Sequence, residues 1–229
     1  MHVPDGFLDA PTSVATGVVA AVGVGLALRG ARRELDDRTA PMAGLVAAFV
    51  FAGQLLNFPV GAGTSGHLLG GALAAVLVGP WTGVLCVSVV LVVQSLLLAD
   101  GGVTALGTNI TLMALVGPLV GWLVFRLVLV ALPRRVPSVV PAAAVAAFVS
   151  VVAAACAFTG LYAVGGTAPI AIGTVAVGML GWHTLIGLGE AAITGLVVAA
   201  VLRARPDLVR GAQGLRSATP LAIRDEAAR

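Results

Sequence analysis

The sequence predicts an all-α integral membrane protein with about seven transmembrane helices, its N-terminus outside the cell and its C-terminus in the cytoplasm. Composition is the first indication, because 59% of the 229 residues are hydrophobic and only 10% are charged, whereas about a quarter of an ordinary soluble domain is charged. The second is the recurrence of apolar runs of about 18 residues, which lack the alternation of a transmembrane β-barrel. The third is the distribution of the arginines.

Seven apolar runs are long enough or apolar enough to be predicted as membrane spans. Their approximate bounds are 11–28, 41–58, 67–79, 82–99, 109–132, 139–164 and 182–202. The third run is short for a crossing at 1.5 Å per residue, and we expect its helix to open at His67. The segment 167–181 is apolar but is interrupted by Pro169 and several glycines, so we expect an interfacial or re-entrant piece there.

The arginines determine the predicted orientation. All 13 basic residues are arginines, in three clusters that run from Arg29 to Arg38, from Arg126 to Arg135, and from Arg203 to the C-terminus. If all three clusters face the cytoplasm, the number of spans between them must be even. Four spans and then two satisfy this rule. We therefore expect a membrane-embedded domain over residues 1–203 and a short cytoplasmic tail over residues 204–229, with no nucleic-acid partner.

Two enzyme motifs are missing from the sequence. A P-loop requires a lysine that reaches the nucleotide phosphates, and the chain has no lysine. If the chain takes part in ATP-driven transport, a partner must therefore supply the hydrolysis. The zinc-protease motif HExxH is also absent. We expect a protein that is not an enzyme.

The N-terminal sequence MHVPDGFLDA places a histidine next to the terminal amine. No basic residue precedes the first apolar run, so a secretory signal is not indicated and we expect the natural N-terminus to be kept. The Met1 amine, the deprotonated backbone nitrogen of His2 and its Nδ1 can chelate one cation, in a planar arrangement that suits Ni(II), Cu(II) and, less strictly, Co(II). His67 could supply a fourth nitrogen. The alternatives are a solvated chain end for His2 and a capping or packing role for His67.

Four segments carry a resemblance to a known family. They are MHVPDGFL at the N-terminus, GTSGHLLGG at 63–71, GTNITLMALVGP at 107–118 and HTLIGLGEAAITG at 183–195. In this order they resemble the CbiM/NikM family, the substrate-binding membrane components (S-components) of energy-coupling factor (ECF) importers for cobalt and nickel. The resemblance extends from residue 1 to about residue 203, and the tail beyond it shows nothing diagnostic.

The resemblance implies a seven-helix S-component in a prokaryotic inner membrane, whose first helix directs the N-terminus into a metal pocket. It implies four metal ligands: the Met1 amine, the backbone nitrogen and the imidazole of His2, and the His67 imidazole. It also implies a membrane coupling (T) subunit, a pair of cytoplasmic ATPase subunits and a small accessory membrane protein as partners. The cargo would be Ni2+ or Co2+, with no cofactor.

Several polar residues are expected around this site. We place Asn57, Thr64, Ser65 and Asn109 in a polar shell around the metal. Asp5 could pair with a polar group and hold the terminus folded inward, or be a simple turn residue after Pro4.

His183 and Glu190 lie seven residues apart, which places them on one face of the last predicted helix. A carboxylate in a membrane span suggests a functional site, but we favour a structural polar network formed by the two residues.

Two rival functions use these same residues. GTSG at 63–66 matches the GxSG of rhomboid intramembrane serine proteases, with His183 as a general base. Glu190 could instead couple a secondary metal transporter to protons. The protease leaves His2 unexplained, and the metal-binding S-component accounts for more residues than either alternative. The sequence does not decide between nickel and cobalt, which helix docks on the coupling subunit, or the oligomeric state.

Overall fold

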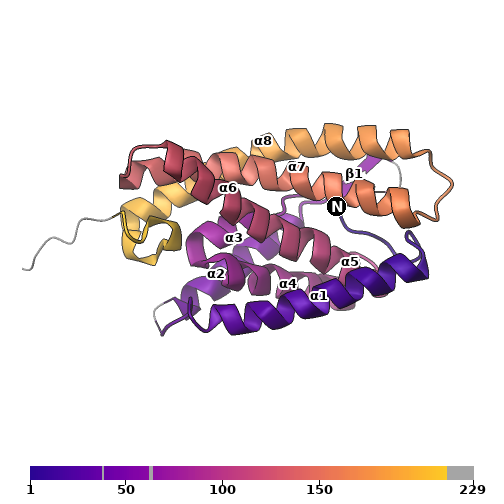
Figure 1. Ribbon diagram of the computed structural model, residues 1–229, viewed down its shortest axis with the longest axis horizontal. Helices are drawn as coiled ribbons and strands as arrows, with labels where there is room; N and C mark the ends of the chain where they lie inside the picture. Colours follow the sequence, from indigo (N-terminus) through magenta and orange to yellow (C-terminus); the bar gives the residue numbers. More distant parts are fainter. Residues whose placement is uncertain (38, 62–63, 216–229) are drawn as a thin grey trace, which may run out of the picture.

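The computed structural model is a bundle of helices that lie roughly along one axis (Figure 1). It describes residues 1–37, 39–61 and 64–215. The main helices are α1 (Ala10–Ala31), α2 (Ala40–Gln54), α3 (Gly71–Val78), α4 (Pro80–Leu97), α6 (Gly117–Ala131), α7 (Val139–Gly165) and α8 (Ile172–Ala204). A short helix α5 (Leu106–Asn109) and a π-helix η1 (Ile110–Val116) lead into α6. The remaining elements are an antiparallel hairpin, β1 (Phe58–Gly61) and β2 (Thr64–Gly66), and three 3-10 turns, η2 (Val136–Ser138), η3 (Pro206–Leu208) and η4 (Arg210–Ala212).

The protein is an all-α, multi-pass membrane protein. Within the described ranges, five helical stretches are long and apolar enough to cross a membrane: Ala10–Ala31, Pro80–Leu97, Leu106–Ala131, Val136–Gly165 and Ile172–Ala204. Helices α2 and α3 are shorter, with 15 and 8 residues. The count of seven spans and the orientation of the termini stay predictions.

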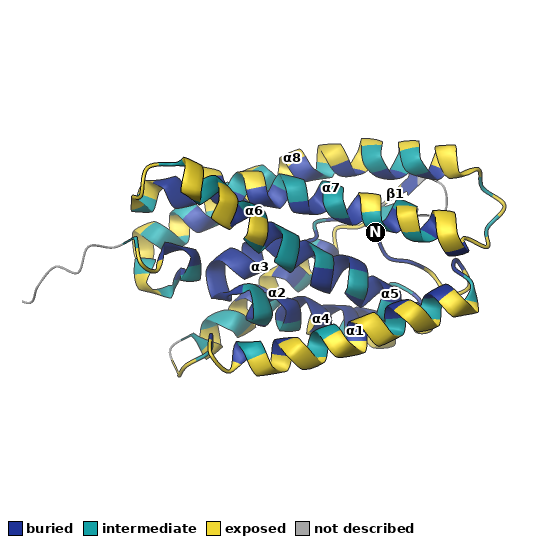
Figure 2. Ribbon diagram, in the orientation of Figure 1, coloured by how far each residue is buried: buried dark blue, intermediate teal, exposed yellow. Residues whose placement is uncertain are grey.

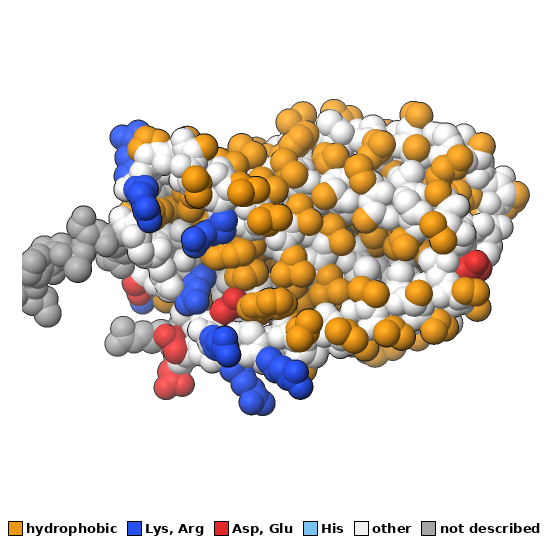
Figure 3. Space-filling view, viewed as in Figure 1, with side chains coloured by type: hydrophobic (Ala, Val, Ile, Leu, Met, Phe, Trp, Pro, Cys, Tyr) orange, Lys and Arg blue, Asp and Glu red, His pale blue; other side chains and the backbone are white. Residues whose placement is uncertain are grey.

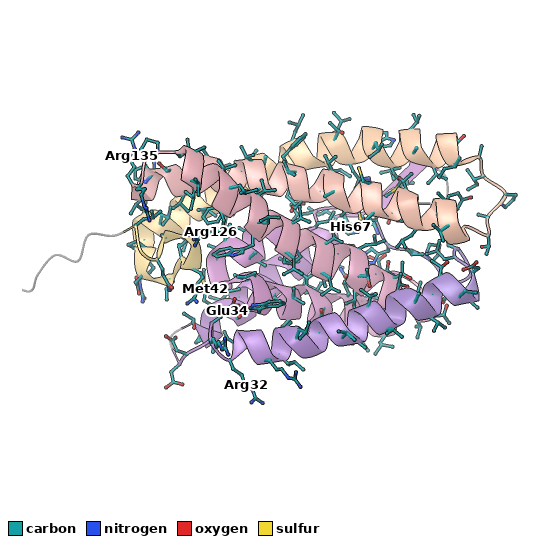
Figure 4. All side chains as sticks on the ribbon, in the orientation of Figure 1. Arg32, Glu34, Met42, His67, Arg126 and Arg135 are labelled. Atoms are coloured by element: carbon teal, nitrogen blue, oxygen red, sulfur yellow. The ribbon has the colours of Figure 1, made fainter. Side chains whose placement is uncertain are left out.

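The charged and apolar parts of the surface are separated along the bundle. Arginine side chains gather at one end, which we call the arginine end, and hydrophobic side chains cover the middle of the visible face (Figure 3). Arg32 and Arg135, from two different predicted clusters, both lie at this end, whereas His67 lies in the opposite half (Figure 4). This arrangement agrees with the requirement that the clusters share one side of the membrane.

Helix α3 lies at the centre of the bundle, and all eight of its residues are buried (Figure 2). Glycines allow its neighbours to approach closely. A Cβ on Gly71 would lie 2.8 Å from the backbone carbon of Gly117, and a Cβ on Gly121 would lie 2.7 Å from the Cβ of Ala72. Since small residues let helix backbones approach in membranes, the short central helix is enclosed by the longer ones.

Three expectations about helix boundaries were wrong. Residues 172–181 are not a re-entrant piece, because they form the first turns of the continuous helix α8. His183, which stood at the start of the last predicted span (182–202), therefore lies well inside α8. His67 does not open a helix either, since α3 begins at Gly71. Glycine is common in membrane helices, where packing against neighbours compensates for its low helix propensity, and α8 packs along α7.

The chain after α8 folds back onto the bundle. Val209 and Ala212 are fully buried, and a Cβ on Gly211 would lie 2.7 Å from the Phe125 ring. The first part of the predicted tail therefore packs against the membrane-embedded helices, and residues 216–229 lie outside the described part of the chain. The domain boundary at residue 203 stays a prediction.

Candidate metal centre

The N-terminal segment folds back from the start of α1 into the bundle, where the N-terminus is seen among the helices (Figure 1). Met1 is 0% exposed and His2 is 5% exposed. The turn back to α1 is fixed by two contacts of Asp9. Its N–H donates to the Gly165 carbonyl at 2.7 Å, and its carboxylate accepts from the Thr12 N–H at the start of α1. A chain end with two buried residues differs from the solvated end that was the alternative for His2.

Asn109 anchors the segment next to His2. Its Oδ1 accepts from the Val3 N–H at 2.7 Å, and its Nδ2 donates to the Val3 carbonyl at 3.1 Å. The Gly102 N–H donates to the same carbonyl at 2.9 Å. Asn109 lies where α5 meets the π-helix η1, and π-turns often occur at functional sites. The Asn109 amide thus fixes the backbone directly after the first two residues.

Asp5 provides a second anchor at the edge of the segment. Its carboxylate accepts hydrogen bonds from the N–H and the hydroxyl of Thr104. These hydrogen bonds favour the ionised form and lower the pKa of Asp5. Asp5 therefore pairs with a polar group that holds the terminus inward, in addition to its place in the turn at Pro4.

His67 lies between the β-hairpin and α3, inside the bundle (Figure 4). Its side chain is buried, and its Nδ1 lies 2.8 Å from the Leu68 carbonyl oxygen. Since a carbonyl can only accept, Nδ1 carries the proton and Nε2 carries the free lone pair. The Nε2 is buried without a hydrogen-bond partner in the described part of the chain. The centroids of the His2 and His67 rings are 4.6 Å apart.

Burial keeps the nitrogens of this centre unprotonated. It lowers the pKa of the Met1 amine from 8.0 to about 4, although the charge of Asp100 partly opposes the shift. Burial and the nearby amine lower the pKa of His2 from 6.5 to about 3, and the same causes hold the pKa of His67 well below its usual value. The amine donates to the Ser65 carbonyl. Three neutral nitrogen bases therefore lie together at pH 7.

Sequence reasoning missed Asp100. Its Oδ2 lies 3.6 Å from the Nε2 of His2, and its carboxylate also accepts from the Asn57 amide at 3.3 Å. Asp100 lies in the loop between α4 and α5, and the signal for it in the sequence was a lone carboxylate before two glycines. A carboxylate facing Nε2 favours a proton there and leaves the lone pair on Nδ1.

Of the residues predicted for the polar shell, some contact the N-terminal segment directly and one contacts only its surroundings. Asn109 holds Val3, and Ser65 contacts the amine through its carbonyl and, at 3.4 Å, its hydroxyl. Asn57 is exposed, and its amide donates to the Asp100 carboxylate. The side chain of Thr64 lies outside the described residues.

His183 and Glu190 are both buried on α8 but bond to different partners. The Nδ1 of His183 lies 2.8 Å from the Met179 carbonyl, one turn earlier on the same helix. Glu190 accepts from the N–H groups of Leu69 and Gly70. The structure gives no hydrogen bond between the two side chains, and none between His183 and Ser65, so neither the expected polar network nor a Ser–His pair is formed directly in the described residues.

Side chains alone do not build a metal site here. Within the described ranges, no three side chains of His, Cys, Asp or Glu are grouped so that they could hold a metal ion. A cation between His2 and His67 would need donors from the main chain or the terminal amine. Glu190 and His67 also line a pocket of about 580 Å³ between α2 and α8.

The fold and this centre define a class: a multi-pass helical membrane protein that encloses a cluster of neutral nitrogen bases. Comparison with known proteins identifies the family. The family described as the cobalt uptake substrate-specific transmembrane region, CbiM, matches residues 2–208. The chain belongs to this family and is a cobalt/nickel transport component; the family is one of metal transporters and not of enzymes.

Individual relatives agree with this assignment. A protein of Haloquadratum walsbyi named as a candidate metal transport protein is 41% identical over 209 residues, which cover 91% of this chain and 93% of the relative. The fused nickel transport protein NikMN of Rhodobacter capsulatus is 40% identical over 127 residues, 56% of this chain and 37% of the relative. The crystal structure of a truncated transition metal transporter superimposes with a TM-score of 0.82 at 30% identity, covering 89% of this chain and 99% of the other.

Proposed function

We propose that this chain binds one Ni2+ or Co2+ ion with high affinity and is the substrate-binding component of an ATP-driven ECF importer. The proposed ligands are the Met1 amine, the backbone nitrogen and Nδ1 of His2, and the Nε2 of His67. The observation that carries the proposal is the position of the two imidazole rings relative to each other.

The ring separation fits two imidazoles in neighbouring corners of a square. In the chelate formed by Met1 and His2, the fourth corner is adjacent to the His2 imidazole. With a metal–nitrogen distance of about 2.0 Å, each ring centroid lies roughly 3.2 Å from the metal, so adjacent rings are about 4.5 Å apart and opposite rings about 6.4 Å. The observed separation of 4.6 Å supports the adjacent arrangement.

The surrounding hydrogen bonds and charges are compatible with a bound cation. A neutral amine that gives its lone pair to a metal keeps its N–H groups, one of which can donate to the Ser65 carbonyl. The deprotonated His2 amide and Asp100 each bring one negative charge, which together balance a divalent ion in a buried site. Asp100 would also hold His2 in the tautomer that presents Nδ1 to the metal.

The energy for uptake would come from partners. The chain has no lysine for a P-loop, so we assign ATP hydrolysis to a pair of cytoplasmic ATPase subunits. A membrane coupling subunit would connect them to this chain, and a small accessory membrane protein completes the proposed assembly in the cell membrane of a prokaryote.

Metal titration of the purified chain with a free Met1 amine tests the binding site. We expect about one Ni(II) per chain, low-micromolar or tighter affinity, and the absorption of a diamagnetic planar centre with nitrogen ligands. A paramagnetic six-coordinate site with oxygen ligands would contradict the proposed ligands.

Metal uptake in cells tests the energy source. Accumulation of radioactive nickel should require the ATPase pair and the coupling subunit, and should stop on ATP depletion. Strong accumulation by this chain alone, insensitive to ATP depletion but abolished when the proton gradient collapses, would instead favour a proton-coupled transporter.

A further inference from the structure

Glu190 holds the loop that carries His67. Its side chain is 1% exposed, and its two oxygens accept from consecutive backbone groups, the Leu69 N–H and the Gly70 N–H, each at 2.8 Å. Gly70 has a φ of +73°, and a Cβ there would lie 2.7 Å from the Val50 side chain. This left-handed conformation, which favours glycine, turns both N–H groups toward one carboxylate.

Gln54 holds the same loop from the other side. This side chain of α2 is fully buried, and its Nε2 donates to the Leu69 carbonyl at 3.0 Å. The carbonyl of Leu69 and the N–H of Gly70 belong to one peptide group, so Gln54 and Glu190 bind its two ends. We call Gln54 and Glu190 the loop clamp.

The preceding peptide group links Glu190 directly to His67. The N–H of Leu69 donates to Glu190, and the carbonyl on the same peptide group, that of Leu68, accepts from the Nδ1–H of His67 at 2.8 Å. The order is therefore carboxylate, peptide group, imidazole. A hydrogen bond to a carboxylate polarises the peptide and makes its carbonyl a stronger acceptor. A stronger acceptor at Nδ1–H fixes the ring and raises the basicity of Nε2.

We infer that Glu190 is a positioning residue for metal binding, which acts on His67 through the Leu68–Leu69 peptide group, with Gln54 holding the neighbouring peptide. This inference rests on the proposed function, because it takes the Nε2 of His67 as a metal ligand. The clamp matters at this point in the fold because His67, Leu68 and Glu190 all line the pocket between α2 and α8, so the loop borders open space there.

The test is a set of variants titrated with Cu(II) as the probe. Copper binds nitrogen sites tightly enough to be measured even when one ligand is lost, and the nitrogen couplings in its electron paramagnetic resonance spectrum count the bound nitrogens. The wild type should show four nitrogens and His67→Ala should show three. If the wild type bound no copper through Met1 and His2, the proposed function itself would be overturned. The wild-type result therefore distinguishes a failure of the proposed function from a failure of the inference about the loop clamp.

Glu190→Gln is the main variant. An amide has one acceptor oxygen, and its NH2 group opposes the second backbone N–H, so the peptide should lose its fixed orientation. We expect Cu(II) and Ni(II) affinity to fall about 10- to 100-fold, the range for groups that orient metal-bound histidines, and the spectrum to shift toward three nitrogens. Thr194→Val is the matched control, because Thr194 is buried one turn further along α8 and its hydroxyl has no hydrogen-bond partner in the described part of the chain. It should leave both readouts unchanged.

The double variant separates a positioning role from a general structural role. In the His67→Ala background, Glu190→Gln should weaken copper binding by no more than about twofold, since the group on which it acts is gone. Gln54→Met provides the same comparison if Glu190→Gln does not fold. It should give a smaller loss that also disappears without His67. Equal losses with and without His67, or wild-type affinity and spectrum in Glu190→Gln, would overturn the inference.

Discussion

Asn109 should determine how firmly the N-terminal segment is held for metal binding, and Asn109→Ala tests this. The substitution removes both hydrogen bonds to Val3. The Val3 carbonyl keeps its bond from the Gly102 N–H, but the buried Val3 N–H is left without a partner. Such a group costs about 1–3 kcal/mol.

This cost weakens metal binding because it destabilises the metal complex more than the metal-free protein. In the metal-free protein the loosened segment can leave the pocket, whereas in the metal complex residues 1 and 2 must be inside it. The cost therefore falls on the bound state. At about 1.4 kcal/mol per tenfold change in the dissociation constant, a cost of roughly 2 kcal/mol weakens Ni(II) binding about 30-fold. Competition titration of the purified protein against a coloured nickel chelator measures this directly.

Asn57→Ala is the matched control for Asn109→Ala. Asn57 is exposed, and its amide donates to Asp100 at 3.3 Å. Exposed substitutions of this kind change stability by no more than about 0.5 kcal/mol, so affinity should change about twofold at most. If Asn109→Ala bound nickel within twofold of the wild type, or if Asn57→Ala lost as much as Asn109→Ala, the anchoring argument would be refuted.

Three further predictions concern the amine, the protons and the glycine next to the site. An N-terminal tag should abolish nickel uptake, because it converts the buried Met1 amine into an amide; protease removal that restores Met1 should recover uptake, and full activity with the tag attached would rule out the amine as a ligand. The pKa values of the amine and of His2 are lowered to about 4 and about 3, so both groups are neutral at pH 7. Each bound metal ion should therefore release about one proton, from the His2 amide. Calorimetry in buffers of different ionisation enthalpy measures this number, and a release of two protons would contradict the prediction. Gly101→Ala should weaken binding about tenfold or more, since Gly101 has a φ of +90° and the added methyl would lie 3.0 Å from the Nδ1 of His2, whereas Gly25→Ala on the exposed face of α1 should bind nickel as the wild type does.

The proposed metal ligands follow from the local sequence, whereas most of the groups that surround them do not. The chelate of Met1 and His2 can be derived from their order along the chain, because all its donors belong to two adjacent residues. Asn109 and Asp5 were also named in advance: Asn109 binds Val3 of the N-terminal segment, and Asp5 joins that segment to Thr104. Asp100 was missed because its relation to His2 exists only after α4 brings the following loop to the terminus. The start of α8 was missed because glycines that weaken an isolated helix are tolerated where it packs along α7.

The sequence by itself determined that the chain is a helical membrane protein, and it placed next to one another the amine, amide and imidazole nitrogens of the proposed chelate. Both follow from short-range properties: the hydrophobicity of successive residues and the covalent spacing of an amine, an amide and an imidazole. Only the tertiary structure decided what surrounds that chelate. The 4.6 Å approach of His2 and His67, the facing carboxylate of Asp100 and the contacts of Glu190 with the His67 loop join residues from separate helices and loops. Such contacts depend on how segments far apart in the sequence pack in three dimensions, as where small residues let helices approach α3 closely, and no local pattern specifies that.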